Sequence, residues 1–154
     1  MAGLIGSFKV GPVAITGGTP QTLLQIVAPA NQRLKVIGYE ISFDGTNSAN
    51  TPCAVQIVRQ TTAGTATNTA VAPTKINEPG GVSETLQASS QNTYTVEPTA
   101  GDLLESYTVP VFGGLYAYSF PPGQEIMIPG GTRLGFKVSC PQGVNAYLTA
   151  KYEE

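Results

Sequence analysis

Apolar and polar residues alternate with a period of two along most of this chain, which is the pattern of β-strands that bury one face. Two runs near the end of the chain, residues 133–140 and 144–152, show the alternation most clearly. We expect their buried faces to consist of Leu134, Phe136, Val138 and Cys140 in the first run, and of Val144, Ala146, Leu148, Ala150 and Tyr152 in the second.

Two runs in the first half of the chain have the same period. In residues 53–59, Cys53, Val55 and Ile57 fall on one face. In residues 33–43, the apolar face carries Ile37, Tyr39, Ile41 and Phe43, with Lys35 on the same side. Shorter runs rich in β-branched and aromatic residues predict further strands at 7–15, 21–28, 105–111, 115–120 and 125–128.

Turn-forming residues separate these runs, and no stretch has the sustained spacing of a long helix. Asp44-Gly45 and the Gly-Gly pairs at 17–18, 80–81, 113–114 and 130–131 predict turns. Short strands without helices predict a sandwich or a barrel. We predict an all-β, jelly-roll-like antiparallel β-sandwich of about eight strands. An immunoglobulin fold is less well supported, because the chain has a long internal excursion and no tryptophan.

The excursion at residues 60–102 interrupts the strand rhythm with small, polar and proline residues. Long segments of this kind inside a domain tend to be functional or to lie on a partner. Two interpretations compete: weak strand, for which Tyr94–Glu97 is the best candidate, or a loop that lies over a neighbouring protein. We favour a mixture of the two, in which the excursion becomes well ordered only in an assembly.

Composition narrows the classes of partner. A length of 154 residues fits one domain. Only 12% of the residues are charged and the net charge is -2, so there is no basic field to attract nucleic acid. No apolar run is long enough for a membrane helix, so we expect no membrane partner. The start of the chain lacks the features of a secretory signal, which fits a product of the cytoplasm.

The residues also argue against catalysis. Histidine is absent, which removes the commonest general base. Two isolated cysteines, Cys53 and Cys140, do not make a usual zinc ligand set, and we interpret them as small buried hydrophobic residues in preference to a disulfide. Asp44 and Asp102 lack the dense acidic string of a calcium loop. We therefore predict no enzyme activity, no catalytic residue, no cofactor and no metal.

Paired carboxylates are the one remaining route to catalysis, because glycoside hydrolysis needs two placed acids. We interpret the candidates as solvated strand ends or salt-bridge partners: Glu84, Glu97, Asp102, Glu105 and Glu125. Glu40 lies on the 33–43 strand opposite the apolar face. It is either a plain outward-facing acid or the partner, across a subunit interface, of Arg33, Lys35 or Arg59.

Aromatic residues concentrate between 107 and 120. In the 115–120 strand, Tyr116, Tyr118 and Phe120 alternate with Leu115 and Ala117. If the aromatic face fills the core, no partner is needed. If Leu115 and Ala117 point inward, the aromatic face is exposed and forms a docking surface. We favour the core interpretation.

Several stretches resemble small structural proteins of tailed-phage virions, in particular capsid decoration (cement) proteins. The resemblance covers the chain from about residue 20 onward and rests on strand and turn patterns: Leu24–Gly38, Phe43–Thr46, Val58–Gly64, Val96–Asp102 and Phe120–Gly135. Residues 1–19 match least. We therefore divide the chain into an N-terminal segment, 1–19, that serves as a contact arm, and a single domain, 20–154.

The resemblance implies a jelly-roll-like domain that binds the major capsid protein on the outside of the head and stabilises it. It also implies a homotrimer, a place on the virion after synthesis in the host cytoplasm, and no catalytic residues. The alternative is a carbohydrate- or host-binding jelly-roll module of a phage fibre or tail.

Overall fold

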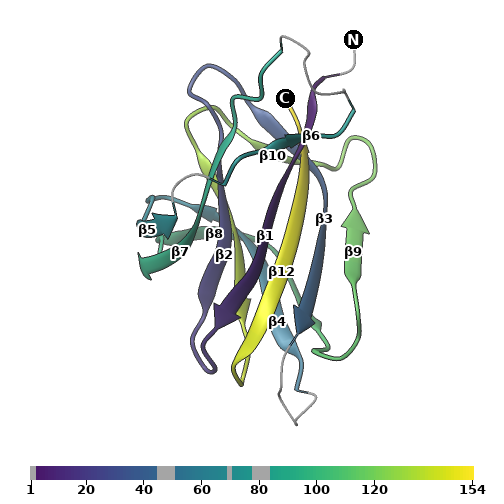
Figure 1. Ribbon diagram of the computed structural model, residues 1–154. Coiled ribbons are helices and arrows are strands. Elements are labelled where there is room, and N and C mark those ends of the chain that lie inside the picture. The colour runs from purple at the N-terminus through teal and green to yellow at the C-terminus, as the bar shows by residue number, and fades with distance from the viewer. Residues whose placement is uncertain (1–2, 45–50, 69–70, 78–83) are drawn as a thin grey trace.

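The computed structural model describes residues 3–44, 51–68, 71–77 and 84–154. These residues form strands and connecting loops (Figure 1). The strands are β1 (Ile5–Ile15), β2 (Gln21–Val27), β3 (Leu34–Asp44), β4 (Cys53–Gln60), β5 (Thr65–Asn68), β6 (Thr74–Lys75), β7 (Ser89–Val96), β8 (Ala100–Val109), β9 (Tyr116–Ser119), β10 (Ile126–Ile128), β11 (Arg133–Ser139) and β12 (Val144–Glu153).

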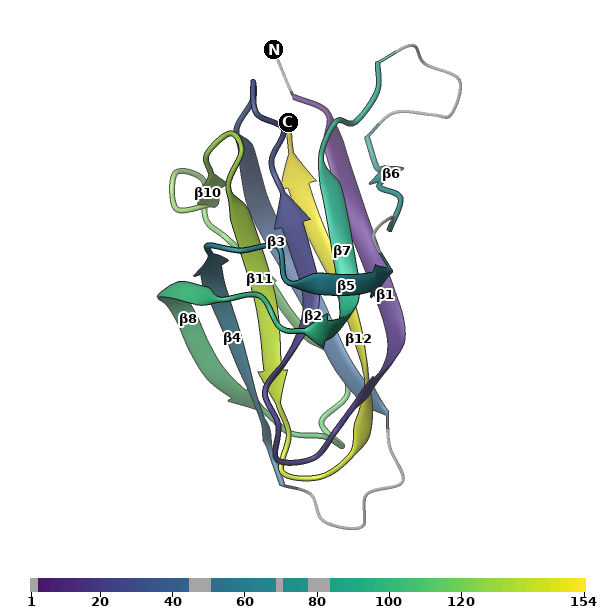
Figure 2. The same ribbon diagram turned by 90° about the vertical axis from the view of Figure 1, so that its left-hand side faces the viewer.

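Two antiparallel sheets pack face to face, as Figures 1 and 2 show from two sides. Sheet A has the strand order β10-β3-β12-β1-β6, and β9 pairs with the same edge of β3 as β10. Sheet B has the order β5-β7-β2-β11-β4-β8. The predicted all-β sandwich is confirmed. The described residues contain twelve strands, and not about eight, because the excursion contributes β5, β6 and β7.

The first four strands each pair with a strand from the second half of the chain, and these pairings are nested. β1 pairs with β12, β2 with β11, β3 with β9 and β10, and β4 with β8. Each early strand thus returns to a late one, so the two ends of the chain lie together in sheet A. The excursion is inserted between β4 and β8, the innermost pair of this nest.

The predicted alternation holds in most of the long strands. Every second residue of β12, from Val144 to Tyr152, is buried between the sheets, and so are Leu134, Phe136 and Val138 of β11. β4 buries Cys53, Val55 and Ile57 as predicted. Together with residues of β1, β2 and β3, these side chains form one apolar core.

The prediction for residues 33–43 is wrong at its beginning. Tyr39, Ile41 and Phe43 are buried, but so are Leu34 and Val36, whereas Ile37 is only half-buried. The pairing register of β3 with β12 shifts between the partners of Gly38 and Val36, which is the signature of a β-bulge. An extra residue there reverses the alternation, so Lys35 and Ile37 face away from the core.

The excursion does not reach away from the domain in its described part. Figure 2 shows β5 and the segment between β7 and β8 crossing the outer side of sheet B. Gln25 Nε2 of β2 donates hydrogen bonds to Gln60 Oε1 at 2.8 Å and to the Thr62 carbonyl at 3.1 Å. The Thr22 amide donates to Glu97 at 2.9 Å. This part of the excursion is therefore ordered by contacts within one chain and not only in an assembly. The predicted weak strand at Tyr94–Glu97 is confirmed for Tyr94–Val96, which belong to β7. Gly80-Gly81 lies outside the described residues, as does Gly45.

The N-terminal segment differs from the expected contact arm. Residues 5–15 form β1, which pairs with β12 on one side and with β6 on the other. Phe8 is fully buried and stacks on Tyr152 with ring centroids 5.0 Å apart. This part of segment 1–19 is therefore a strand of the domain whose inward face lies in the core, while outward residues such as Lys9 and Pro12 are exposed.

The cysteines are buried, as expected, but the interpretation that they are unlinked is wrong. Cys53 and Cys140 form a disulfide whose Cα atoms are 4.3 Å apart. The cause is the register of β4 on β11, in which Ala54 faces Ser139, so the preceding and following residues meet. The bond joins two neighbouring strands of sheet B and closes a loop with a sequence separation of 87.

Candidate protein-interaction surface

One long side of the sandwich is formed by two edge strands. β8 ends sheet B and is paired with β4 alone, whereas β9 pairs with β3 at the edge of sheet A. Figure 1 shows β9 standing at the margin of the molecule. Edge strands present unpaired backbone groups, so they are places where a second protein can add contacts.

An aromatic cluster closes the gap between these two edges. Tyr107 of β8 stacks on Tyr116 of β9 with ring centroids 4.8 Å apart. Tyr39 of β3 lies behind both, 6.1 Å from Tyr107 and 5.6 Å from the core residue Phe136. Rings from both sheets therefore pack in one cluster, which fixes the position of β9 relative to sheet B.

The tyrosine hydroxyls in this cluster are structural. Burial, the largest cause, raises the pKa of both Tyr39 and Tyr107 above the ordinary value of 10.0. The Tyr107 hydroxyl is buried and makes no hydrogen bond of good geometry, although the Tyr39 hydroxyl is close enough to affect its pKa. Both groups are protonated at neutral pH and have no feature of an acid–base pair.

Three large side chains between residues 112 and 118 are exposed, and we call them the apolar ridge: Phe112, Leu115 and Tyr118. Their exposed fractions are 57%, 62% and 40%. Phe112 and Leu115 lie in the loop between β8 and β9, where the Gly113 amide donates to the Pro110 carbonyl at 3.3 Å. Gly114 has φ of +82°, which glycine adopts without steric cost.

The structure decides between the two interpretations of this region. Phe120 is buried and Tyr116 half-buried against the aromatic cluster, so the core interpretation is confirmed for these two rings. Tyr118 is tilted against Tyr39 at 6.0 Å but keeps two-fifths of its surface exposed. The opposite face, with Leu115 and Ala117, points to solvent. The docking alternative, in which the aromatic face is exposed and Leu115 and Ala117 point inward, is wrong for this strand apart from the partial exposure of Tyr118. The exposure of Phe112, in the preceding loop, was not predicted.

The five candidate carboxylates lie in different settings. Glu97 accepts the Thr22 amide, and Glu125 accepts the Gly123 amide at 2.7 Å, so these two act as backbone acceptors and not as salt-bridge partners. Asp102 lines a groove beside Arg59. Glu84 and Glu105 are exposed. Within the described ranges, no group of three or more Cys, Asp or Glu side chains is arranged to hold a metal ion.

Glu40 has a partner in its own chain. It forms an ion pair with Lys151 of β12, a residue that the sequence did not suggest for it. The two lie diagonally on neighbouring strands, since Glu40 faces Thr149 in the pairing register. Asp44 accepts a hydrogen bond from the Tyr147 hydroxyl at 3.0 Å. Both acids therefore have a hydrogen-bond or ion-pair partner within the described part of the chain.

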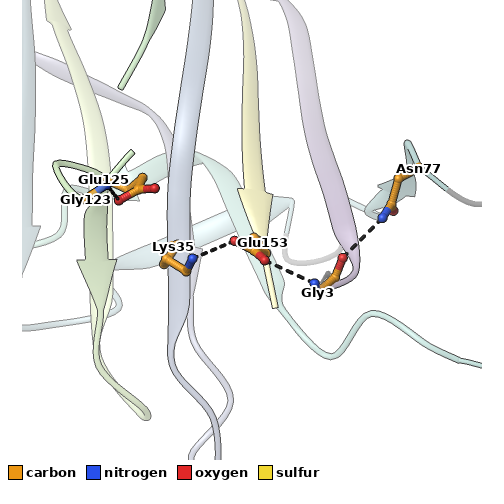
Figure 3. Close-up of polar contacts among 6 residues, drawn as sticks. All are labelled: Gly3, Lys35, Asn77, Gly123, Glu125 and Glu153. Atoms are coloured by element: carbon orange, nitrogen blue, oxygen red, sulfur yellow. Dashed lines mark hydrogen bonds and ion pairs between the residues drawn. The ribbon is translucent and has the colours of Figure 1, made fainter. Parts of the chain in front are cut away.

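Polar contacts also fasten the two chain ends (Figure 3). Glu153 accepts the Gly3 amide at 3.1 Å and pairs with Lys35 Nζ at 2.7 Å. Hydrogen bonding from Lys35 is the main cause that lowers the pKa of Glu153, and the same pairing raises the pKa of Lys35. The Gly3 carbonyl in turn accepts Asn77 Nδ2 at 3.1 Å. These groups are satisfied within the chain.

No protein-family model, curated protein or solved structure matches this chain. In the described residues, no helix has the length and apolarity to cross a membrane. A proposal for the function therefore rests on the surface geometry and on the resemblance of the strand and turn patterns.

Proposed function

We propose that this protein is a structural virion protein that binds the outside of a phage capsid lattice and stabilises the head. The observation that carries the docking part of this proposal is the apolar ridge. Three large side chains are exposed within a short segment, and one of them, Tyr118, packs against Tyr39 of the aromatic cluster. The capsid as the partner is supported by the resemblance of the sequence to decoration proteins.

The ridge suits protein docking on energetic grounds. Isolated exposed apolar residues are common, but a group of them on one rigid segment marks an interaction site. Aromatic anchors such as Phe112 and Tyr118 lose little conformational entropy on binding and supply much of the energy of an interface. The Tyr118 ring already packs against Tyr39, so ordering this ring on binding should cost little.

The connectivity supports the proposed class of fold. The nested pairings describe a long antiparallel hairpin that is rolled up into two sheets, and we infer that the sandwich is a jelly roll. In a homotrimer on a repeating lattice, several copies bind at once, so a modest affinity of each copy gives a strong overall affinity.

The alternative, a carbohydrate-binding module, predicts exposed aromatic rings in a cleft. Three grooves of about 480, 470 and 330 Å³ in the described part of the chain have no aromatic lining residue. Stacking of a neutral sugar is therefore less well supported than docking of a protein surface.

Electron cryomicroscopy of the source particle tests the proposal. We expect density for the sandwich on the exterior of the head, with the β8–β9 side against the capsid. Density on the tail alone, or none on the particle, would overturn the proposal. Light scattering of the purified protein checks the trimer, which a monomer at every concentration would contradict.

A further inference from the structure

β8 is the longest of the strands that end a sheet. It has 10 residues and pairs with β4 alone within the described part of the chain. The strands β5, β6, β9 and β10 at the other margins have between 2 and 4 residues each. Figure 2 shows β8 at the margin of sheet B. In an antiparallel pair, every second residue turns its N–H and C=O away from the partner strand, so β8 presents a row of backbone groups that β4 does not bind.

The other long strand with an open side, β1, shows how an edge is normally protected. β6 covers only Gly6 and Ser7 of β1, and the remainder of that side has no described partner strand. The remainder contains Lys9, a register shift on β12 and Pro12, which has no N–H to donate. Lysine, proline and bulges are the usual means by which proteins prevent another strand from pairing with an edge.

The second half of β8 lacks these three features. The strand contains neither lysine nor proline. Its pairing with β4 shifts register twice in the first half but is regular from Glu105 to Val109. The side chains of Glu105, Ser106 and Thr108 are exposed. This half leads directly into the loop that carries Phe112, so a strand added here lies beside the apolar ridge.

The charge of β8 discriminates between possible partners. Asp102 and Glu105 are exposed, and neither forms an ion pair with another described residue. The sequence has no lysine or arginine between Lys75 and Arg133. Two copies of this chain that paired through β8 would bring four carboxylates onto one ribbon without a cation in either strand, and like charges on paired strands are unfavourable. A second copy is therefore a poor occupant, whereas a strand with lysine or arginine complements this edge.

We infer that the second half of β8 pairs with an extended, basic segment of the partner protein, which adds a strand to sheet B. The inference rests on the proposed function, because it names the chemistry of the segment that the β8–β9 side binds. Glu105 and Tyr107 share a face of β8, since they face Ile57 and Val55 in the regular register. The added strand then places a lysine or arginine beside Glu105 and, two residues along, an apolar side chain beside Tyr107. Backbone hydrogen bonds give such a strand its affinity, and the alternate side chains give it specificity.

Hydrogen exchange of the native protein, free and bound to source particles stripped of it, tests the inference. We expect the outward-facing amides between Glu105 and Val109 to exchange roughly tenfold more slowly, or slower still, on the particle, because they gain hydrogen-bond acceptors. The amides of β4, which is paired on both sides, should not change. If native protein binds and the β8 amides exchange as before, this inference alone is overturned. If native protein does not bind, the proposed function falls with it.

Charge variants test the chemistry of the added segment. Glu105→Lys should weaken binding to the particles roughly tenfold or more, because it sets like charges against each other. Glu105→Gln, which keeps the shape of the side chain, should weaken binding by a smaller factor. Glu84→Lys, the same change of charge at an exposed acid of the excursion, is the matched control and should bind as the native protein does. Unchanged exchange of the β4 amides verifies the fold of each variant. Native-like binding of either folded Glu105 variant, or equal weakening by Glu84→Lys, would overturn the basic segment.

Discussion

The described excursion between β4 and β8 and the apolar loop between β8 and β9 are opposites in composition and in placement. The excursion is polar, yet it is folded onto sheet B, where Gln25 and Gln60 are almost completely buried. The loop is apolar, yet Phe112 and Leu115 are more than half exposed. Composition alone would have assigned the two regions the other way round.

The difference shows that burial of a segment depends on hydrogen-bond partners and on free space in the core, and not on composition alone. The buried amide of Gln60 has hydrogen-bond partners on both of its polar atoms: it accepts from Gln25 and donates to Thr22 Oγ1 at 3.1 Å. Burial of polar groups is tolerated when their bonds are made. Phe112 and Leu115 have no core left to fill, because the tyrosines behind them close the gap between the sheets. An apolar group left over in this way is available to a partner.

The largest expected effect concerns the covalent bond at the base of the apolar loop. Cys53 pairs in the sheet with Val109, which directly precedes that loop. Replacing both cysteines with alanine should lower the free energy of unfolding by about 2–5 kcal/mol, because a long closed loop is opened. Urea denaturation without reductant measures the change. An unaltered midpoint would show that the disulfide does not hold this region.

The hydrogen bonds under the excursion should contribute less. Gln60→Ala leaves Gln25 and Thr22 without their partner, so we expect a loss of about 1–3 kcal/mol. The matched control is Gln56→Ala on the same strand, where the side chain is half-buried and the change should be below about 0.5 kcal/mol. Equal effects of the two substitutions would mean that the amide cluster does not fasten the excursion.

A smaller effect is expected from pH, at the contact between the chain ends and Asn77 of the excursion. The pKa of Glu153 is lowered on folding, so its stabilisation is present above about pH 4.5 and is lost as the pH falls through the folded-state pKa. The pKa of Lys35 is raised, so its contribution is lost as the pH rises above about 10.5.

Thermal unfolding across this range measures the effect on both sides. Glu153→Gln should flatten the acid side of the Tm profile by a small amount, because both partners are well exposed. The amide protection of Val111, next to the apolar loop, should not change with Glu153. A steeper acid side in the variant would contradict the assignment.

Sequence reasoning found most of the scaffold and little of the surface. Alternation predicted the inward residues of β4, β11 and β12, because burial of one face sets the period of a strand. It failed at Ile37, since a bulge depends on the partner strand and leaves no mark in the alternation itself. The pairing of Cys53 with Cys140 depends on the register of β4 on β11, which is a property of the fold.

The candidate sites were harder to predict for the same reason. Arg59 and Arg133 are far apart along the chain and line one groove only because β4 and β11 are neighbours. The aromatic residues between 107 and 120 were a correct signal of an unusual region. Which of them would remain exposed depended on how much space Tyr39 and Phe136 had already filled.

Binding of a ridge variant to the source particle tests the central claim most directly. Phe112→Ser/Leu115→Ser should leave the free energy of unfolding within about 0.5 kcal/mol of the native value, because both side chains are exposed in the free protein. Cosedimentation with particles stripped of this protein should show that native protein rebinds and that the variant binds at least tenfold more weakly. Native-like binding of a correctly folded variant would contradict the account.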